Sequence, residues 1–495
     1  MKKGQQQLMT DSFEIQGIWF LPGKDLETEG IKGTLKYSPG SICLELLDTF
    51  EEDLILNEDQ NNLRPLILGF SCQGEWLSLY ECYRTKTHIR IPGFDTESYI
   101  INKFYVGTQL VEDETQPLFE RCSFSLTYLD AWSTVNIMER ITEKETYKST
   151  IIINPKIASG QKKILSSETE NICFAEEIYW QQTFPKNYLQ SETFQLIFNR
   201  FYNFYRKDKS YFNFICCNEN INKLRYLLVM LLGNPVYFTY IDIYLHTVQS
   251  NLPTPIISNQ EQKCRLFYNQ VGDITKDRKI SRNNPSSILI NRRDILNHIE
   301  TIFCNWLKKY EQLAEVVYPY ICDLYLNQYV ETKFLNTVKS LETYYRFFMT
   351  EQQKHTQTIN REKQLLLEFI EKNICEEQRS YFIQRINYED EKSLRKKLKA
   401  ILTASPFGLL SQLFKNTTSK EYNKIINSIV DTRNYFTHRD SKSKYPYTLE
   451  GHSLYLLTNK LNILLHYHIL VLIGVPAETV QRRICEFSKF KSSFE

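Results

Sequence analysis

Glycine and proline are scarce in this chain of 495 residues, which holds 16 glycines and 15 prolines. So small a share excludes collagen-like, proline-rich and low-complexity sequences. Aromatic residues are abundant instead, at 14%, whereas an intrinsically disordered chain would be poor in them. Hydrophobic residues at 42% and charged residues at 24% are ordinary for folded proteins. At ~100–200 residues per domain, the composition predicts a few globular domains with large buried cores.

Long uninterrupted apolar runs are also missing. The longest apolar stretch, residues 463–475, contains His466 and His468 and is shorter than the ~20 residues that span a bilayer. The first residues, MKKGQQQLMTDSFEIQG, lack the apolar segment of a secretory signal. We therefore expect a cytoplasmic protein with no membrane association. The two histidines are expected to be packed or partly exposed on a core helix rather than catalytic.

Motifs for metal and nucleotide chemistry are absent as well. The 12 cysteines form no Cys-x-x-Cys pair and lie in apolar runs such as SICLEL and NFICC, which is typical of small core residues in the cytoplasm. A zinc site assembled from distant residues is the less favoured alternative, so we expect no metal and no cofactor. The chain also has no Gly-x-x-x-x-Gly-Lys loop, no His-Glu-x-x-His motif and no Gly-x-Ser-x-Gly elbow. Nucleotide-driven and common hydrolase chemistries therefore lack support.

The net charge of +2 hides an uneven distribution of charge along the chain. Residues 1–150 carry 14 Lys and Arg against 24 Asp and Glu, whereas residues 391–495 carry 17 against 8. The basic C-terminal segment indicates an anionic partner, although a solvated surface of mixed charge would explain it equally well.

The N-terminal region, residues 1–290, is predicted to be β-rich. Between residues 12 and 130, short aromatic and β-branched runs such as FEIQGIWFLP and WLSLYECY recur, separated by turn-forming residues. This pattern is typical of an antiparallel sandwich or barrel, in which Trp19 and Phe20 would pack into the sheet. Further along, NINKLRYLLVMLLG predicts a helix that ends at Gly233. The polar, turn-rich residues 250–290 predict a connecting stretch or a long loop.

From residue 291 onward the apolar residues recur at helical spacing, as in RRDILNHIETIFCNWLKKY and FLNTVKSLETYYRFF. Residues 291–495 therefore predict an α-helical bundle. The expected fold class is α+β and multidomain: a β-rich N-terminal domain of the sandwich or barrel kind, followed by an all-α bundle.

The segment IVDTRNYFTHRD, at the predicted end of a helix, gathers residues suited to phosphate-ester chemistry. Arg433 and His438 are separated by four residues, Asn434 adds a polar side chain and Arg439 adds a second cation. A histidine can take a proton from a ribose 2′-hydroxyl or give one to a leaving oxygen. An arginine can bind the scissile phosphate and stabilise its developing charge. Together they suffice for metal-independent cleavage of RNA, since RNA carries the 2′-hydroxyl and DNA does not.

The Arg-x-x-x-x-His spacing is weak evidence when taken alone. With 22 arginines and 8 histidines in the chain, fewer than one such match is expected by chance, and a second one does occur. It runs from Arg293 to His298 at the front of the helical half. We interpret that match as a surface arginine beside an unrelated histidine.

The context of Arg433 and His438 resembles the HEPN superfamily of helical ribonucleases. Their mark is an arginine, usually followed by Asn, Asp or His, and then a histidine four to six residues after the arginine, near the end of an inner helix; RNYFTH fits it. The layout resembles more closely the ApeA-type anti-phage proteins, because QGIWFLPG and FLNTVKSLETYYR resemble the openings of their N-terminal and HEPN domains. The resemblance places the HEPN core at about residues 326–475.

The resemblance implies a bacterial anti-phage endoribonuclease of the abortive-infection kind, with cellular RNA as substrate and transfer RNA among the candidates. HEPN ribonucleases usually form homodimers in which two Arg/His motifs meet in one composite site and act without a metal. Glu342, in the opening HEPN helix, is a candidate partner for Arg433, and a solvent-facing carboxylate is an equal alternative. The β-rich domain would be the sensor or regulatory part, contacted by a phage-encoded activator.

A run of four cations, RKKLKA, lies in the same basic segment. We favour a phosphate-contacting patch over a solvated helix face for these residues, with Arg439 as a further RNA-binding cation. The four are Arg395, Lys396, Lys397 and Lys399.

Two alternatives from other functional classes remain. A non-catalytic RNA-binding or protein-interaction module would keep the HEPN scaffold and lack turnover. A nucleotidyl transferase that acts with a HEPN partner would need a Gly-Ser and paired-Asp signature, which the sequence lacks. Tyr435 and Phe436 are expected in the core or at a dimer contact rather than as stacking platforms for bases.

Overall fold

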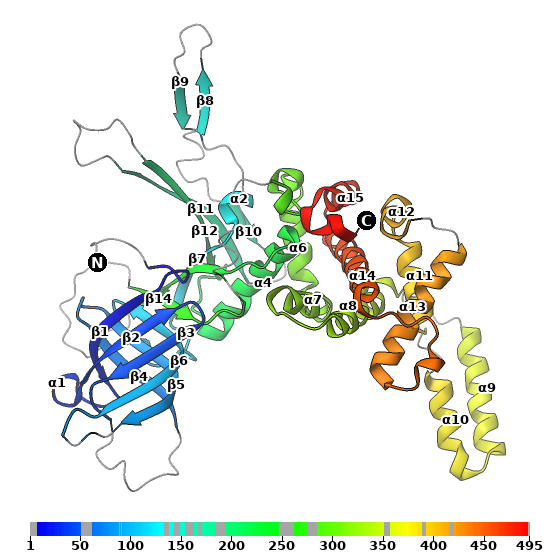
Figure 1. Ribbon diagram of the computed structural model, residues 1–495, viewed down its shortest axis with the longest axis horizontal. Coiled ribbons are helices and arrows are strands. Elements are labelled where there is room, and N and C mark those ends of the chain that lie inside the picture. The colour runs from blue at the N-terminus through cyan, green and yellow to red at the C-terminus, as the bar shows by residue number, and fades with distance from the viewer. Residues whose placement is uncertain are drawn as a thin grey trace. The chain divides into compact units, whose positions relative to one another are not determined.

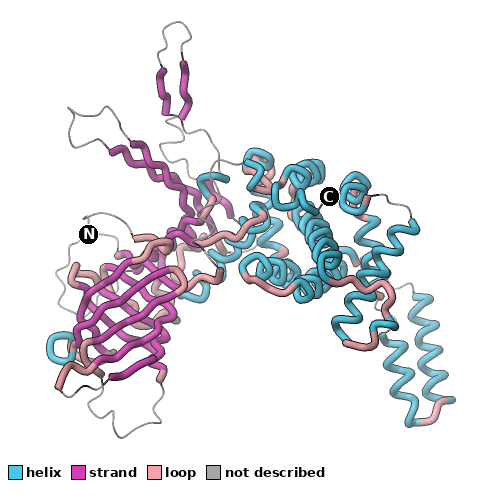
Figure 2. Tube along the Cα trace, in the orientation of Figure 1, coloured by secondary structure: helices cyan, strands magenta, loops and turns pink. Residues whose placement is uncertain are grey.

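The computed structural model of the protein divides into two compact units, Met1–Lys308 and Lys309–Glu495, which are treated separately below. The first is rich in strands and the second is helical, so the expected fold class is confirmed (Figures 1 and 2). The described residues are 7–50, 62–88, 90, 92–132, 138–142, 149–153, 163–166, 171–183, 195–246, 262–272, 274, 285–350, 357–388, 393–415 and 419–493.

Six antiparallel strands of the first unit close into a barrel. Their order is β6-β3-β2-β1-β4-β5, and β5 pairs again with β6 to complete the ring. Figure 1 shows them in blue colours at the N-terminal end of the chain. The strands are β1 (Phe13–Phe20), β2 (Ile31–Ser38), β3 (Ser41–Leu46), β4 (Leu63–Ser71), β5 (Trp76–His88) and β6 (Thr96–Gly107), with the short helix α1 (Leu26–Glu29) after β1.

The sheet continues beyond the barrel because β6, besides its pairing with β5, is long enough to pair with two further strands. Its first half pairs with β3, whereas Lys103–Gly107 pairs with β14. From β14 the order runs β13, β7, β12, β11, β10, all antiparallel. The bounds are β7 (Phe119–Leu126), β10 (Lys163–Ser166), β11 (Cys173–Thr183), β12 (Gln195–Tyr205), β13 (Phe238–Leu245) and β14 (Lys263–Tyr268); β8 (Met138–Thr142) and β9 (Ser149–Ile153) form a separate pair.

The barrel core is organised around Trp19. Its side chain is fully buried, and its partner on the neighbouring strand β4 is Gly69. A Cβ atom at Gly69 would lie 2.4 Å from the indole ring. A glycine is therefore required opposite the tryptophan, since real contacts of a Cβ are not that short. Phe20 is buried as well, so the expectation that both aromatic residues pack into the sheet is confirmed.

Two local predictions for this unit have different outcomes. Helix α4 (Phe214–Leu232) is followed by Gly233 in the left-handed region, at φ 65°, as predicted for a glycine that ends a helix. The expected loop at residues 250–290 is wrong in part, because β14 lies within it. Cys264, Leu266 and Phe267 are buried between β13 and β6, and the polar composition around them concealed so short a strand.

Residues 291–308 belong to the first unit, although the helical pattern that begins at residue 291 suggested a boundary there. Helix α6 (Ile299–Lys308) packs on the sheet: the Phe303 ring lies edge-on to Phe174, at 5.6 Å between centroids. Trp306 Nε1 donates to the backbone oxygen of Lys223 at 2.9 Å. Helical periodicity therefore locates a helix but not a domain boundary, since a β-rich unit can end in a helix. The remaining short helices here are α2 (Leu129–Trp132), η1 (Pro285–Ser287) and η2 (Arg292–Ile295).

The second unit is a helical bundle around helices α8 and α14. Helix α8 packs against α7, α11, α13 and α14, and its last turn widens into the π-helix η3. The helices are α7 (Tyr310–Tyr325), α8 (Val330–Tyr344), η3 (Tyr345–Met349), α9 (Gln357–Asn373), α10 (Glu376–Tyr388), α11 (Leu394–Thr403), α12 (Phe407–Phe414), α13 (Ser419–His438), η4 (Lys442–Lys444), α14 (Gly451–Leu472), α15 (Ala477–Glu486) and η5 (Ser488–Ser493).

His466 and His468 are both buried in α14. The His468 Nε2 atom lies 2.9 Å from the Ser405 hydroxyl, and burial lowers the pKa of His468 to about 4. A lowered pKa means that the folded protein holds this imidazole neutral, whereas the unfolded chain takes up a proton below pH ~6.5. Stability is therefore lost as the pH falls from about 6.5 towards 4.

We expect this titration to be visible in the His468→Gln variant, which cannot take up the proton. Between pH 7.5 and 4.5 the free energy of unfolding should fall by about 2 kcal/mol more in the wild type than in the variant. Urea unfolding of the full chain, followed by helical circular dichroism, measures the difference. Equal pH dependence of the two proteins would show that the folded state does not exclude the proton.

Candidate functional site

Helix α13 carries the Arg433 to His438 segment on its last turns. His438 is its final residue, and Arg439 follows in the left-handed region, at φ 54°, where its N–H donates to Tyr435 O at 2.8 Å. A residue in this conformation ends a helix in the same way as a terminal glycine. The buried Thr432 hydroxyl accepts from Leu449 N at 3.0 Å, which ties the following loop back to the helix.

The functional groups of the segment are accessible. Arg433 is half-buried and donates from Nη1 to Asn434 Oδ1 at 3.1 Å. His438 is exposed at the helix end, and its imidazole makes no hydrogen bond or ion pair to any residue that the structure describes. The Arg439 guanidinium lies over the Phe436 ring, 5.2 Å from its centroid. The half-buried Arg433 guanidinium and the exposed His438 imidazole therefore both lie on the last turns of α13.

The structure brings Arg433 to Asn434 but leaves Arg433 and His438 without direct contact in the described part of the chain. At 3.6 residues per turn, side chains five residues apart point about 140° away from each other around the helix axis. Asn434 and His438, four residues apart, point in nearly the same direction. The hydrogen bond to Asn434 therefore turns the Arg433 guanidinium towards the side of the helix that carries His438.

Glu342 has a different partner from the expected one. Its Oε1 accepts from Lys397 Nζ at 2.7 Å, and no hydrogen bond or ion pair joins it to Arg433 in the described structure. The physical reason is the burial of Lys397, whose side chain is only 5% exposed, since a buried ammonium group requires a counterion. In this structure Glu342 is therefore the counterion of Lys397, rather than the partner of Arg433 or a free solvent-facing carboxylate, the two alternatives that the sequence left open.

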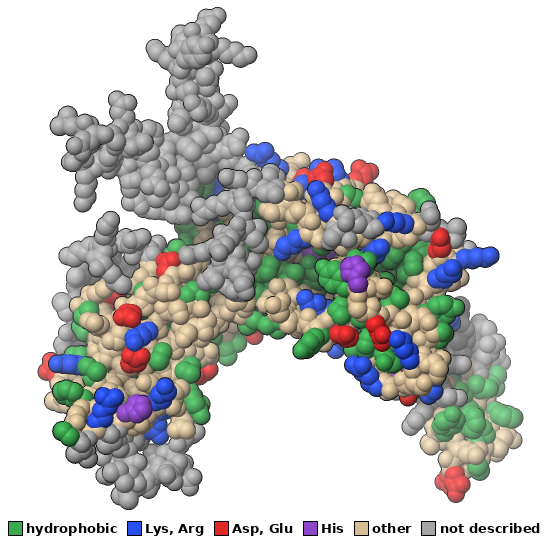
Figure 3. Space-filling view, viewed as in Figure 1, with side chains coloured by type: hydrophobic (Ala, Val, Ile, Leu, Met, Phe, Trp, Pro, Cys, Tyr) green, Lys and Arg blue, Asp and Glu red, His purple; other side chains and the backbone are tan. Residues whose placement is uncertain are grey.

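The same ion pair corrects the expected cationic patch. Lys397 is buried and cannot contact a phosphate, whereas Arg395, Lys396 and Lys399 are exposed. Arg395 donates from Nη1 to Asn427 Oδ1 of α13, which links α11 to the helix that carries Arg433. Exposed Lys and Arg side chains are spread over the visible face of this unit (Figure 3).

The second Arg-x-x-x-x-His match lies in the first unit. Arg293 is in η2 and His298 in the turn before α6, and both side chains are exposed. In the second unit, Phe436 is buried and Tyr435 is half-buried with its ring 5.3 Å from that of Phe436, so Phe436 is a core residue as expected.

A feature of the helical unit that the sequence did not indicate is a cavity of about 360 Å³ between α11, α12 and α13, called here the interhelical hollow. No periodicity or motif marks it, because its residues come from three helices. Its lining consists of Lys399, Leu402, Thr403, Ser405, Phe407, Leu410, Tyr422, Asn423 and Ile426.

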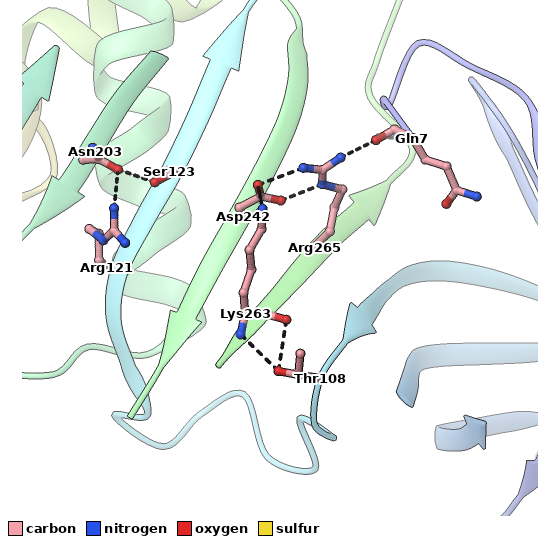
Figure 4. Close-up of polar contacts among 8 residues, drawn as sticks. All are labelled: Gln7, Thr108, Arg121, Ser123, Asn203, Asp242, Lys263 and Arg265. Atoms are coloured by element: carbon pink, nitrogen blue, oxygen red, sulfur yellow. Dashed lines mark hydrogen bonds and ion pairs between the residues drawn. The ribbon is translucent and has the colours of Figure 1, made fainter. Parts of the chain in front are cut away.

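A network of polar side chains crosses the sheet of the first unit. Asn203, Ser123, Asp242 and Arg265 are neighbours on the adjacent strands β12, β7, β13 and β14 (Figure 4). Arg265 donates to both Asp242 oxygens, at 2.6 and 2.8 Å, and to the backbone oxygen of Gln7 at 2.6 Å. The charged pair is buried and satisfied, which is typical of a structural network.

The described residues offer neither a cluster of metal ligands nor a membrane-spanning helix. No group of three or more His, Cys, Asp or Glu side chains there is placed to hold a metal ion. None of the described helices combines the length and the apolar character that a membrane crossing demands.

The helical unit, with its Arg-Asn-x-x-x-His segment at the end of α13, matches the family model of the ApeA-like HEPN domain over residues 335–479. Residues 14–306 match the model of ApeA N-terminal domain 1. The chain therefore belongs to the ApeA family and is an anti-phage protein with a C-terminal HEPN domain. No curated protein and no solved structure is significantly similar to it. Arg433 and His438 lie inside the matched HEPN residues, whereas Arg293 and His298 lie outside them.

Proposed function

We propose that the protein is a metal-independent endoribonuclease that cuts cellular RNA during phage infection through Arg433, Asn434 and His438. The observation that carries the proposal is the arrangement at the end of α13. A guanidinium bonded to Asn434 and an exposed imidazole with no partner among the described residues lie within one and a half turns of each other on a helix of the HEPN domain.

The reaction that suits these groups is transesterification within the RNA strand. The ribose 2′-oxygen attacks the adjacent phosphorus, the bond from phosphorus to the 5′-oxygen breaks, and a 2′,3′-cyclic phosphate and a 5′-hydroxyl result. His438 acts as the general acid/base for the proton of the 2′-hydroxyl or of the leaving oxygen. Arg433 binds the non-bridging oxygens and stabilises the charge that develops on them, and Asn434 orients the guanidinium. Glu342 acts indirectly, by holding the buried Lys397 of α11.

The remaining parts of the proposal concern partners. Attack and departure each need a proton transfer, which favours a homodimer in which a second copy of the motif completes the site. The exposed cations Arg395, Lys396, Lys399 and Arg439 contact phosphates of the strand. The first unit acts as the regulatory part, responds to a phage-encoded activator, and keeps the enzyme inactive in the cytoplasm until infection; transfer RNA is a candidate substrate.

The experiment is an end-group analysis of the products. Purified full-length protein is incubated with total RNA in the presence of EDTA, with and without lysate from phage-infected cells as the source of the activator. We expect fragments with 2′,3′-cyclic phosphate and 5′-hydroxyl ends. Tight RNA binding without cleavage under both conditions would favour the non-catalytic RNA-binding module instead, and fragments with 5′-phosphate ends would contradict the proposed chemistry.

A further inference from the structure

We infer that the interhelical hollow binds an unpaired base of the RNA strand whose phosphate is held at Arg433. The inference rests on the proposed function and deepens it, because it assigns a base-recognition subsite to the same reaction.

The hollow has the composition of a site for a flat, mostly apolar ligand. Leu402, Leu410 and Ile426 are buried and form its floor, while Tyr422 is half-buried and the Phe407 side chain is 71% exposed at the rim. Its volume of about 360 Å³ falls within the range of small-ligand sites. Exposed aromatic rings beside such a cavity are the platforms on which unpaired bases stack.

Polar groups of the hollow suit the edge of a base. Asn423 is exposed, and its amide makes no hydrogen bond to any described residue, so both its donor and its acceptor are open to a ligand. The Ser405 hydroxyl donates to Ile401 O at 2.8 Å and is also bonded to His468, so it shapes the floor and is not available as a nucleophile.

The charge at the rim favours a nucleic acid over a peptide segment. Lys399 is the charged side chain among the described residues that line the hollow, and it has no ion-pair partner within the described structure. Arg395 lies four residues earlier on the same helix, about one turn away, and donates a hydrogen bond to Asn427 on α13. An apolar cavity whose rim carries unpaired positive charge is complementary to a base attached to a phosphate backbone.

The hollow and Arg433 share the same side of α13. Ile426 and Arg433 are seven residues apart, which places them within about 20° of each other around the axis and about 10 Å apart along it. Asn427 and Asn434 are related in the same way. A single strand that follows this side of α13 beyond Ile426 can therefore place one base in the hollow and a nearby phosphate at the Arg433 guanidinium.

The test measures RNA binding in the His438→Ala background, where cleavage is expected to be too slow to consume the RNA. Short fluorescent homopolymers of uridine, adenosine and cytidine are titrated by anisotropy, together with the same strands that carry one abasic nucleotide. Phe407→Ala should weaken binding of the preferred strand about 5- to 100-fold. Asn423→Ala should weaken the binding of only some of the three homopolymers. Tyr329→Ala removes another exposed aromatic ring of this unit, outside the hollow, and should change the affinity less than twofold.

The abasic strands decide between stacking and a general loss of affinity. For the parent protein, which carries only His438→Ala, one abasic position should weaken RNA binding by the same factor as the Phe407→Ala substitution does. In the protein that carries Phe407→Ala, the abasic position should weaken binding no further. Parent-like RNA binding by Phe407→Ala and Asn423→Ala overturns the subsite, as does a parent that binds none of the strands. Loss of self-association with RNA binding unchanged assigns the hollow to a protein contact and also overturns it. The predicted binding pattern without cleavage by the wild type would leave the subsite standing and remove the nuclease proposal alone.

Discussion

The His438→Ala variant is expected to lose RNA cleavage by about 10²- to 10⁴-fold in kcat/KM, the usual contribution of a general acid/base. The side chain is exposed at the end of α13 and makes no hydrogen bond or ion pair to the residues that the structure describes, so its removal should leave the circular dichroism spectrum and the unfolding midpoint unchanged. Cleavage of a short RNA in EDTA, with the activating lysate fraction present, measures the effect.

The chain supplies a matched control for this experiment in His298, which lies five residues after Arg293 and is equally exposed. His298→Ala should cleave RNA at the wild-type rate, because that pair belongs to the first unit and lies outside the HEPN match. Relief of growth toxicity on overexpression by His438→Ala, and not by His298→Ala, would give the same answer in cells. Unchanged cleavage by His438→Ala would remove the imidazole from the mechanism and with it the proposed site.

The parts of the structure that follow local rules could be predicted from the sequence. Short strand-like runs punctuated by turn residues indicated an antiparallel sandwich or barrel, Gly233 marked the end of α4, and the polar residues after RNYF marked the end of α13. Each of these depends on neighbours along the chain, where spacing and turn chemistry act directly.

Features that depend on distant residues could not be predicted in this way. The Lys397 ammonium is buried against Glu342, 55 residues earlier in the chain, and nothing in RKKLKA separates that lysine from its exposed neighbours except the turn of the helix. Strand β14 is bounded by polar sequence and is identified only by its pairing between β13 and β6. The interhelical hollow likewise exists only where three helices meet.

Arg433→Ala and His438→Ala are each expected to be inactive alone and to restore RNA cleavage when one copy of each forms a mixed dimer. Arg433→Ala should lower cleavage about 10²- to 10³-fold, as the loss of one group that stabilises transition-state charge does. Five residues of helix separate the two side chains by about 140°, so one copy of α13 presents its arginine and its histidine in different directions. In a twofold dimer the arginine of one copy can face the histidine of the other across the same phosphate.

Mixing Arg433→Ala with His438→Ala should therefore recover cleavage, because each mixed dimer retains one of its two Arg/His pairings. Isolated mixed dimers should reach about half of the wild-type rate, and an exchanged mixture in which half of the dimers are mixed about a quarter. The mixed dimers are formed by co-expression with two different affinity tags and isolated by sequential purification, so that the rate per dimer is measured directly. Arg433→Lys mixed with His438→Ala is the matched control and should recover to the same extent, because the substituted position 433 then shares its site with the alanine at 438 while the other site keeps a native arginine and histidine. No recovery in mixed dimers of proven composition would mean that each protomer uses its own arginine and histidine, with Asn434 as the group that brings the guanidinium around the helix to the imidazole.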